Sequence, residues 1–296
     1  MTALSYTLIS FPGLGLELDP PSTIQLGPLT IHFYGLIIAV GMLLAVLYAS
    51  KRSKEFGLKE DDLIDGVLWV APFAIICARL YYCIFEWDQY ASNPISILYI
   101  WNGGLAIYGG VLGAVIGLSV FCKVRKIKAT AMMDVVSLGL LIGQLVGRWG
   151  NFMNREAFGA PTDSFLRMGL YNTATGAVEY YHPTFLYESL WNFVGFLLLH
   201  FLSKKRKYDG QVALGYVAWY GLGRAFIEGL RMDSLYWGPF RVSQVLAGIS
   251  CVVAVAVLLW QGFRPHDPAK MLVNQAKDAK SEEAPKTEDE THENEG

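Results

Sequence analysis

Several polar residues lie close together at the end of an apolar segment in the middle of the chain. The stretch GRWGNFMNREAFG, residues 147–159, contains two arginines, two asparagines and a glutamate: Arg148, Asn151, Asn154, Arg155 and Glu156. A guanidinium group presents a planar set of N–H donors that can bind two phosphate oxygens at once. This combination of residue types therefore indicates a site for an anionic ligand.

Other ionisable residues lie inside apolar segments elsewhere. They include Arg79, His182, Tyr187, Glu188, Arg224, Glu228 and Arg231. A charge at membrane depth costs several kcal/mol unless it is paired or faces a water-filled cavity. Arg224 and Glu228, one helical turn apart, are equally well explained as a structural pair. Four arginines nevertheless face only three glutamates on the same side of the membrane, which predicts a cavity with at least one arginine free for an anion. The arginines are Arg79, Arg148, Arg224 and Arg231, and the glutamates are Glu156, Glu188 and Glu228.

The composition indicates a membrane protein. Of the 296 residues, 53% are hydrophobic and only 17% are charged, which is too apolar for a soluble chain of this length. We therefore predict an all-α polytopic membrane protein with seven transmembrane helices. Each span needs about 20 apolar residues. The predicted spans are 31–50, 63–85, 96–122, 132–150, 184–203, 210–229 and 243–262.

Basic residues orient these spans. Lysines and arginines follow the first, third, fifth and seventh spans, whereas the intervening connections contain few of them. The positive-inside rule then places the N-terminus outside and the C-terminus in the cytoplasm. We expect an outer-face segment 1–30, a helical catalytic domain 31–263 with an outer connection 151–183, and a disordered, dispensable acidic tail 264–296.

Several kinds of chemistry lack a recognisable motif. The sequence contains no HExxH zinc spacing, no GxxxxGK[ST] phosphate loop, no dinucleotide-binding glycine pattern and no GxSxG nucleophile turn. The four cysteines lie in apolar runs without a CxxC spacing, as expected of small buried side chains. We expect no metal, no cofactor and no nucleic-acid partner.

Five segments resemble, in order, the motifs of the prolipoprotein diacylglyceryl transferase family. GRWGNFMNREAFG is similar to the family pattern GRxGNFxNxExxG, with Gly147, Arg148 and Gly150 among the matching positions. The other four segments are HFYGLIIAVG, WNGGLAIYGG, HPTFLYE and YGLGRAFIEGLR. The tail and the stretch 160–181 lie outside the resemblance.

The resemblance implies a transferase in the bacterial plasma (inner) membrane, with its active site towards the outer face. Such an enzyme moves the diacylglyceryl group of phosphatidylglycerol onto the lipobox cysteine thiol of a preprolipoprotein and releases glycerol phosphate. Arg148 and Arg224 would then clamp the phosphate as charge builds on it in the transition state. The other residues expected at the substrate are Asn151, Asn154, Gly159, Tyr34, Tyr220, Glu228, Arg231, Gly103 and Gly104.

The sequence departs from the family at one position. Some members have histidine before the paired glycines, where it is a candidate base for the thiol, and this chain has Tyr108. Tyrosine is a weak base unless a nearby arginine lowers its pKa. Three alternatives stay open: Tyr108 acts beside an arginine, Glu156 takes the proton, or the reaction needs no strong base.

Two rival functions also fit part of the pattern. A transporter or flippase for an anionic lipid headgroup would also use outward arginines, but the inner halves of the spans are nearly uncharged. An intramembrane hydrolase would need a nucleophile beside a base within the spans, and no convincing serine–histidine combination occurs. The transferase is the preferred interpretation.

The orientation can be tested with reporter fusions. A reporter that is active only in the cytoplasm should be active when fused after Lys207 or Arg264. It should be silent when fused within 86–95 or 165–180. Activity within 165–180 would contradict the seven-span topology.

Overall fold

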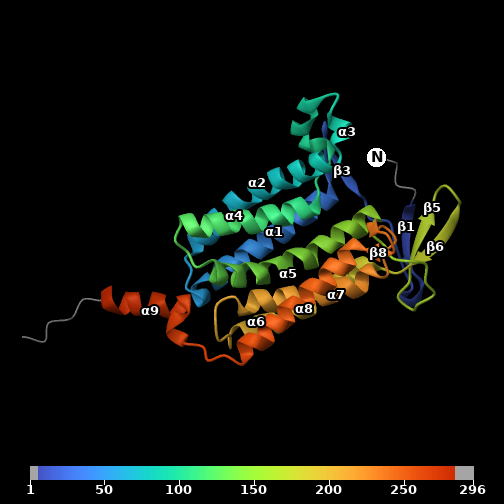
Figure 1. The fold of residues 1–296 in the computed structure, drawn as a ribbon. Coiled ribbons are helices and arrows are strands. Elements are labelled where there is room, and N and C mark those ends of the chain that lie inside the picture. The colour runs from blue at the N-terminus through green and yellow to red at the C-terminus, as the bar shows by residue number, and fades with distance from the viewer. Residues whose placement is uncertain (1–5, 284–296) are drawn as a thin grey trace, which may run out of the picture.

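Long helices form the body of the protein, and small β-sheets gather at one end (Figure 1). The structure is a computed structural model that describes residues 6–283. Its long helices are α1 (Phe33–Arg52), α2 (Glu60–Phe85), α4 (Ile107–Val124), α5 (Ala129–Asn154), α6 (Thr184–Ser203), α7 (Gln211–Glu228) and α8 (Val242–Gly262). Shorter helices are α3 (Trp87–Tyr90) and α9 (Leu272–Glu283), with 3₁₀ helices at Pro12–Leu14, Ser53–Phe56, Pro94–Leu98, Ile100–Asn102 and Pro268–Lys270.

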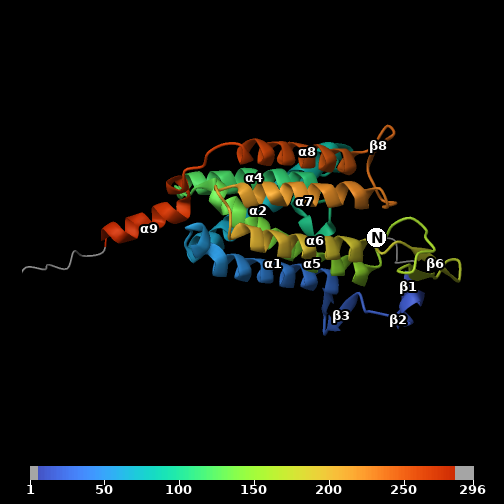
Figure 2. The same cartoon turned by 90° about the horizontal axis from the view of Figure 1, so that it is seen from below.

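The strands join segments that are far apart in the sequence. They are β1 (Tyr6–Phe11), β2 (Leu16–Leu18), β3 (Thr23–Leu26), β4 (Leu29–His32), β5 (Met168–Asn172), β6 (Ala177–Tyr181), β7 (Tyr236–Trp237) and β8 (Phe240–Arg241). One antiparallel sheet has the order β2-β1-β5-β6, and β3–β4 and β7–β8 are hairpins. We call the end with these strands the sheet end and the opposite end, which carries α9, the tail end (Figure 2).

These strands correct the expectation of an all-α fold. The helices are confirmed, but the connections at the sheet end pair with one another as strands. Backbone N–H and C=O groups need partners wherever they are buried, and β1 lies between β2 and β5, with Ile9 fully buried. The strands are too short for their alternation to be distinguished in the sequence.

Among the described residues 6–283, six helices are long and apolar enough to cross a membrane: α1, α2, α4, α5, α6 and α8. The predicted multi-pass membrane protein is confirmed at this level. Helix α7 lies where the sixth span was predicted, but its mean hydropathy is lowered by polar side chains such as Arg224 and Glu228. It packs chiefly against α8 and also contacts α5 and α6.

The third predicted span, 96–122, begins later than expected. Helix α4 starts only at Ile107, because Gly103 and Gly104 have φ angles of 86° and 75°, which a helix does not allow. Arg79 of α2 holds this turn by donating to four backbone carbonyls at 2.7–3.0 Å: those of Ser96, Ile97, Gly103 and Gly104.

Helix α5 is central, packing against α1, α6 and α7. Its buried Asp134 accepts hydrogen bonds from the backbone N–H groups of Gly210 and Ala213, both at 2.8 Å. These N–H groups lie at the start of α7, where no turn of the same helix can satisfy them. Asp134 therefore fixes the start of α7 against α5.

Two tryptophans fix α6 against α7. The indole N–H of Trp191 donates to the carbonyl of Trp219 at 2.9 Å, and Trp219 donates to Trp191 in return at 2.9 Å. The rings stack with their centroids 4.4 Å apart. Each ring lies on a glycine of the other helix, Gly195 or Gly223, where a Cβ atom would approach an indole nitrogen to 2.2 Å.

The first part of the predicted disordered tail is ordered. Met271 is buried, and the N–H of Leu272 donates to Asp209 at 2.8 Å. Lys128 pairs with the same carboxylate at 2.9 Å. The segment docks because its Leu272 N–H supplies a partner to this buried carboxylate, which the composition of the tail did not reveal. Residues 284–296 lie outside the described residues, and their disorder stays a prediction.

The docked segment should contribute to stability, contrary to the expected dispensability of the tail. Truncation after Asp267 removes one partner of Asp209, which should lower the free energy of unfolding by about 1–3 kcal/mol. Thermal unfolding of the purified protein measures the change, and truncation after Glu283 is the control. Equal unfolding temperatures for the two truncations would show that docking stabilises nothing.

Candidate active site

The buried carboxylate of Glu188 joins three arginines at the sheet end of the bundle. Arg148 of α5 lies 2.5 Å from it, Arg224 of α7 3.0 Å, and Arg231, just beyond α7, 3.4 Å. The Glu188 side chain is only 4% exposed. We call Glu188 and these three arginines, together with Glu228 and Asp233, the arginine cluster.

The two further carboxylates complete the pairing. Arg224 also contacts Glu228 at 2.6 Å, and Arg231 contacts Asp233 at 2.7 Å. Three arginines thus face three carboxylates, so the expectation of a spare arginine in this cluster is wrong. Arg79 is not part of it, because its guanidinium is bound by the carbonyls of the 96–104 turn.

Asp233 shows how strongly the outer pair is coupled. Burial raises the pKa of its carboxyl, but the hydrogen bonds and positive charge of Arg231 outweigh burial and hold the pKa below its ordinary value. A carboxyl whose pKa is lowered by folding stabilises the protein at neutral pH. That contribution is lost as the pH falls through the folded pKa.

The arginines lie closer to the surface than the inner carboxylates. The side chains of Arg148 and Arg224 are 20% and 17% exposed, whereas Glu188 and Glu228 are 4% and 2% exposed. Arg148 and Arg224 are therefore more accessible to an anion than Glu188 and Glu228 are. Each guanidinium has five N–H donors, which is more than its carboxylate contacts require.

Asn151 links the cluster to Glu156. Its side-chain oxygen accepts a long hydrogen bond of 3.5 Å from Arg148, and its amide donates to Glu156 at 3.0 Å. The ring of Tyr34 packs against Gly150, two residues from Arg148 along α5. The structure thus places Tyr34, Asn151 and Glu156 close to Arg148, and their predicted contact with substrate stays a prediction.

Tyr220 also lies beside the cluster. It lines a small cavity with Glu188 and Arg224, and its ring stacks on Tyr216 with centroids 5.7 Å apart. The structure thus places Tyr220 and Arg224 at the same cavity. Whether Tyr220 contacts substrate stays a prediction.

Tyr108 and Asn154 lie apart from the arginines. The Tyr108 hydroxyl is hydrogen-bonded to Ser243 of α8 at 2.7 Å. Asn154 is the last residue of α5. Across residues 6–283, no hydrogen bond or ion pair given by the structure joins either side chain to the cluster. The alternative in which Tyr108 acts beside an arginine therefore lacks structural support.

The glycines predicted at the substrate have different surroundings. A Cβ atom on Gly104 would lie 2.3 Å from Arg79, so the close approach here is to protein. Gly159 is buried, and its N–H donates to the carbonyl of His182 at 2.9 Å. Its backbone also forms an isolated antiparallel β-bridge with that of Arg231. Gly103 has open space on its Cβ side. Gly104 and Gly159 therefore serve packing, and Gly103 is free of such contacts.

Two roles were missed in the sequence. Glu188 was recognised as a charge within HPTFLYE but was not assigned to the site, although its position in an apolar segment was a signal. Arg155 is buried and binds Asp19 at 2.7 Å and the carbonyl of Pro20 at 2.9 Å. It ties the N-terminal segment to α5 and does not contact the cluster.

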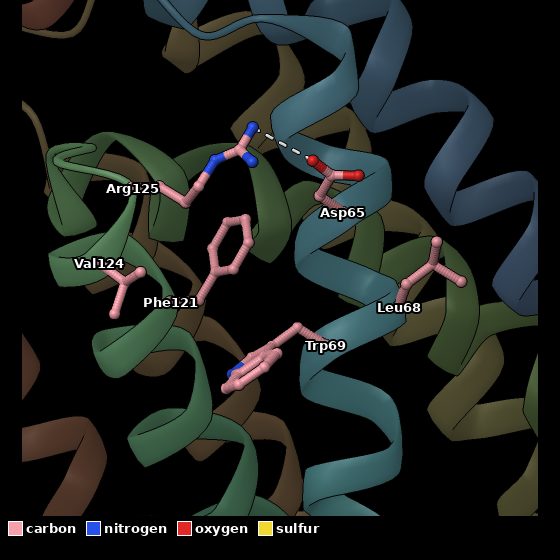
Figure 3. A pocket seen from close by; sticks show the side chains of 6 residues that line it. All are labelled: Asp65, Leu68, Trp69, Phe121, Val124 and Arg125. Carbon is pink, nitrogen blue, oxygen red and sulfur yellow. Dashed lines mark ion pairs between the residues drawn. The ribbon is translucent and has the colours of Figure 1, made fainter.

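A larger cavity, about 380 Å³, lies between α2 and α4 at the tail end (Figure 3). Its walls are chiefly apolar, with Leu68, Trp69 and Phe121 among them. Arg125 at its edge pairs with Asp62 and Asp65, both at 3.1 Å, and is therefore neutralised. This cavity has a single arginine, whereas three guanidinium groups converge on Glu188 in the arginine cluster.

The chain is similar to known proteins over most of its length. Residues 21–260 match the family described as prolipoprotein diacylglyceryl transferase. The phosphatidylglycerol–prolipoprotein diacylglyceryl transferase of Listeria monocytogenes serotype 4a is 42% identical over 88% of this chain and 96% of its own. The protein of the same name from Limosilactobacillus reuteri is 46% identical over 81% and 90%, and that from Halalkalibacterium halodurans 41% over 86% and 93%.

The structure predicts that Glu188 holds the cluster together. Glu188→Gln keeps the shape but leaves buried arginines without their shared counter-charge, which should cost about 3–5 kcal/mol of unfolding free energy. Asp233→Asn is the control, because Asp233 is 53% exposed and its loss should cost less, about 1 kcal/mol or below. Chemical denaturation measures both, and equal effects would contradict a special role for Glu188.

Proposed function

The chain belongs to the prolipoprotein diacylglyceryl transferase family, and we propose that it transfers the diacylglyceryl group of phosphatidylglycerol to a prolipoprotein. The relatives that carry this activity in their names match the chain over most of their length. The single structural observation that supports the proposal best is the convergence of Arg148, Arg224 and Arg231 on Glu188 at one end of a membrane bundle. Such a site suits a phospholipid phosphate.

We further propose that the sheet end faces outwards in the bacterial inner membrane. Helix α7 would be the seventh span, since its 18 residues extend over about 27 Å. The basic residues that support this orientation lie at the tail end: Lys51, Arg52, Lys123, Arg125, Lys126, Lys128, Lys204, Lys205, Arg206 and Lys207. The N-terminus is then outside and the C-terminus in the cytoplasm.

The proposed reaction forms a thioether. The lipobox cysteine sulfur attacks the carbon of the diacylglyceryl group that bears the phosphate. The bond between this carbon and the phosphate oxygen breaks, and glycerol phosphate leaves with the bonding electrons. Negative charge grows on the leaving phosphate, where Arg148 and Arg224 stabilise it. Glu188 holds both arginines near each other, and they turn N–H groups to the phosphate when it binds, before the charge develops.

We assign the thiol proton to Glu156 rather than to Tyr108. Glu156 is exposed and is held by Asn151, which also contacts Arg148. The Tyr108 hydroxyl is instead paired with Ser243 on α8. A nearby guanidinium favours the thiolate form of an incoming cysteine, so a modest base is sufficient.

The remaining residues have supporting roles in this proposal. Asn151, Tyr34 and Tyr220 line the headgroup site, while Glu228 and Arg231 hold Arg224 and Glu188 in place. Asn154 and Gly103 are retained as predicted substrate contacts, because Asn154 ends α5 near Asn151 and Gly103 is unobstructed.

One assay separates the transferase from its rivals. The purified protein is given radiolabelled phosphatidylglycerol and a lipobox peptide, and a peptide with serine in place of the cysteine is the control. Label covalently bound to the cysteine peptide alone is expected. Lipid movement between leaflets without a covalent product would support the transporter, and peptide cleavage the hydrolase.

Arg148→Lys tests whether the arginine clamps phosphate through its planar fork. Lysine keeps the charge but cannot bind two oxygens in a plane, so transfer should fall by about 10²–10³ while insertion stays normal. Arg167→Lys, on the outer connection, is the control and should retain activity. Near-normal transfer by Arg148→Lys would mean that the residue only balances Glu188.

Two substitutions test which residue is the general base that takes the thiol proton. Glu156→Gln should lower the transfer rate by about 10²–10⁴, the range typical of a lost general base. Tyr108→Phe removes only the hydroxyl that Ser243 binds and should stay within a few-fold of normal. Initial rates at saturating peptide measure both, and the reverse ranking would assign the base to Tyr108.

A further inference from the structure

A buried amide beneath the arginine cluster is unexplained by the proposed reaction. Asn192 lies one turn after Glu188 on α6, and therefore on the same face of the helix. The residue is only 2% exposed. Its side-chain oxygen has no hydrogen-bond partner among the described residues. Buried polar atoms in folded proteins are nearly always paired, so this oxygen needs a partner that the chain does not supply.

A cavity of about 10 Å³ adjoins this amide. Its polar lining residues are Glu188, Asn192, Tyr220 and Arg224, and its apolar wall includes Ile227. One water molecule needs about 10–15 Å³ and two to four polar partners. The cavity meets both requirements, whereas a larger ligand would not fit.

We propose that this cavity binds one water molecule and that Asn192 is a positioning residue for the arginine cluster. The water donates one hydrogen bond to the Asn192 side-chain oxygen and the other to Glu188. It accepts from Arg224 or from the Tyr220 hydroxyl. Glu188 then has a donor besides its arginines.

That donor matters when phosphate binds, and this step rests on the proposed function. Arg148 and Arg224 contact Glu188 in the structure, and they must redirect N–H groups towards an incoming phosphate. A buried carboxylate that loses its partners is strongly unfavourable. The water, held by Asn192, still donates a hydrogen bond to Glu188 when the arginines turn towards the phosphate. It thereby lowers the cost of that exchange of partners.

Phosphate affinity tests this role without relying on transfer. Asn192→Leu has a similar size but no hydrogen-bonding group, and it displaces the water. Its dissociation constant for inorganic phosphate should rise about tenfold, as expected for a lost hydrogen bond to a charged group. Asn192→Ser keeps a hydroxyl and room for water, so its affinity should lie closer to that of the unmodified protein.

Ser189→Ala is the matched control. Ser189 is buried on the same helix but bonds to the carbonyl of Leu145 at 3.0 Å and does not line the cavity. It should leave phosphate affinity unchanged. A role confined to packing would lower the unfolding temperature or the number of binding sites without changing the dissociation constant.

An unchanged dissociation constant in Asn192→Leu would overturn the proposal. If that variant fails to insert, Asn192→Ala carries the test, and equal affinities for the alanine and serine variants would overturn it. A crystal structure that resolves ordered water should show one at Asn192, and its absence there would also overturn the proposal. Lack of covalent transfer by the unmodified protein would instead contradict the proposed function alone.

Discussion

A single buried carboxylate constrains the arrangement of three helices. Glu188 is almost fully buried and draws Arg148 from α5, Arg224 from α7 and Arg231 from beyond α7 to one point. Each buried ion that is left unpaired costs several kcal/mol. A shift of one residue in the register of α6 or α7 would separate these charges. The bundle must therefore hold its helices in a defined register at the depth where the cluster lies.

Two sets of hydrogen bonds away from the cluster fix the register of α7 against α5 and α6. Asp134 caps the first turn of α7 from α5, and the reciprocal hydrogen bonds of Trp191 and Trp219 lock α6 to α7. With the start and the middle of α7 fixed, Arg148 and Arg224 are held at Glu188, which is less exposed than either of them. Under the proposed function, this arrangement suits electrostatic catalysis, which needs donors that are in place before charge develops on the substrate.

The helices were predictable because their apolar runs are long, and α6 has the bounds that the sequence indicated. Helix α4 was misplaced because the φ angles of Gly103 and Gly104 depend on carbonyl contacts from Arg79, 24 and 25 residues away. Asn151 contacts Arg148, as their spacing of three residues on one helix suggests, whereas Asn154 on the same helix does not. The balance of charges was not predictable, since Glu188 and Arg231 are 43 residues apart and meet only through the tertiary fold. The short strands and the docked tail were missed for the same reason.

The structure of the protein with phosphatidylglycerol bound, determined in a lipid nanodisc, tests the central claim most directly. The phosphate is predicted to lie within hydrogen-bonding distance of both Arg148 and Arg224, with Glu188 still buried beneath them. A phosphate bound elsewhere, with both arginines still on Glu188 as in the ligand-free protein, would contradict the claim and reduce the cluster to a structural role.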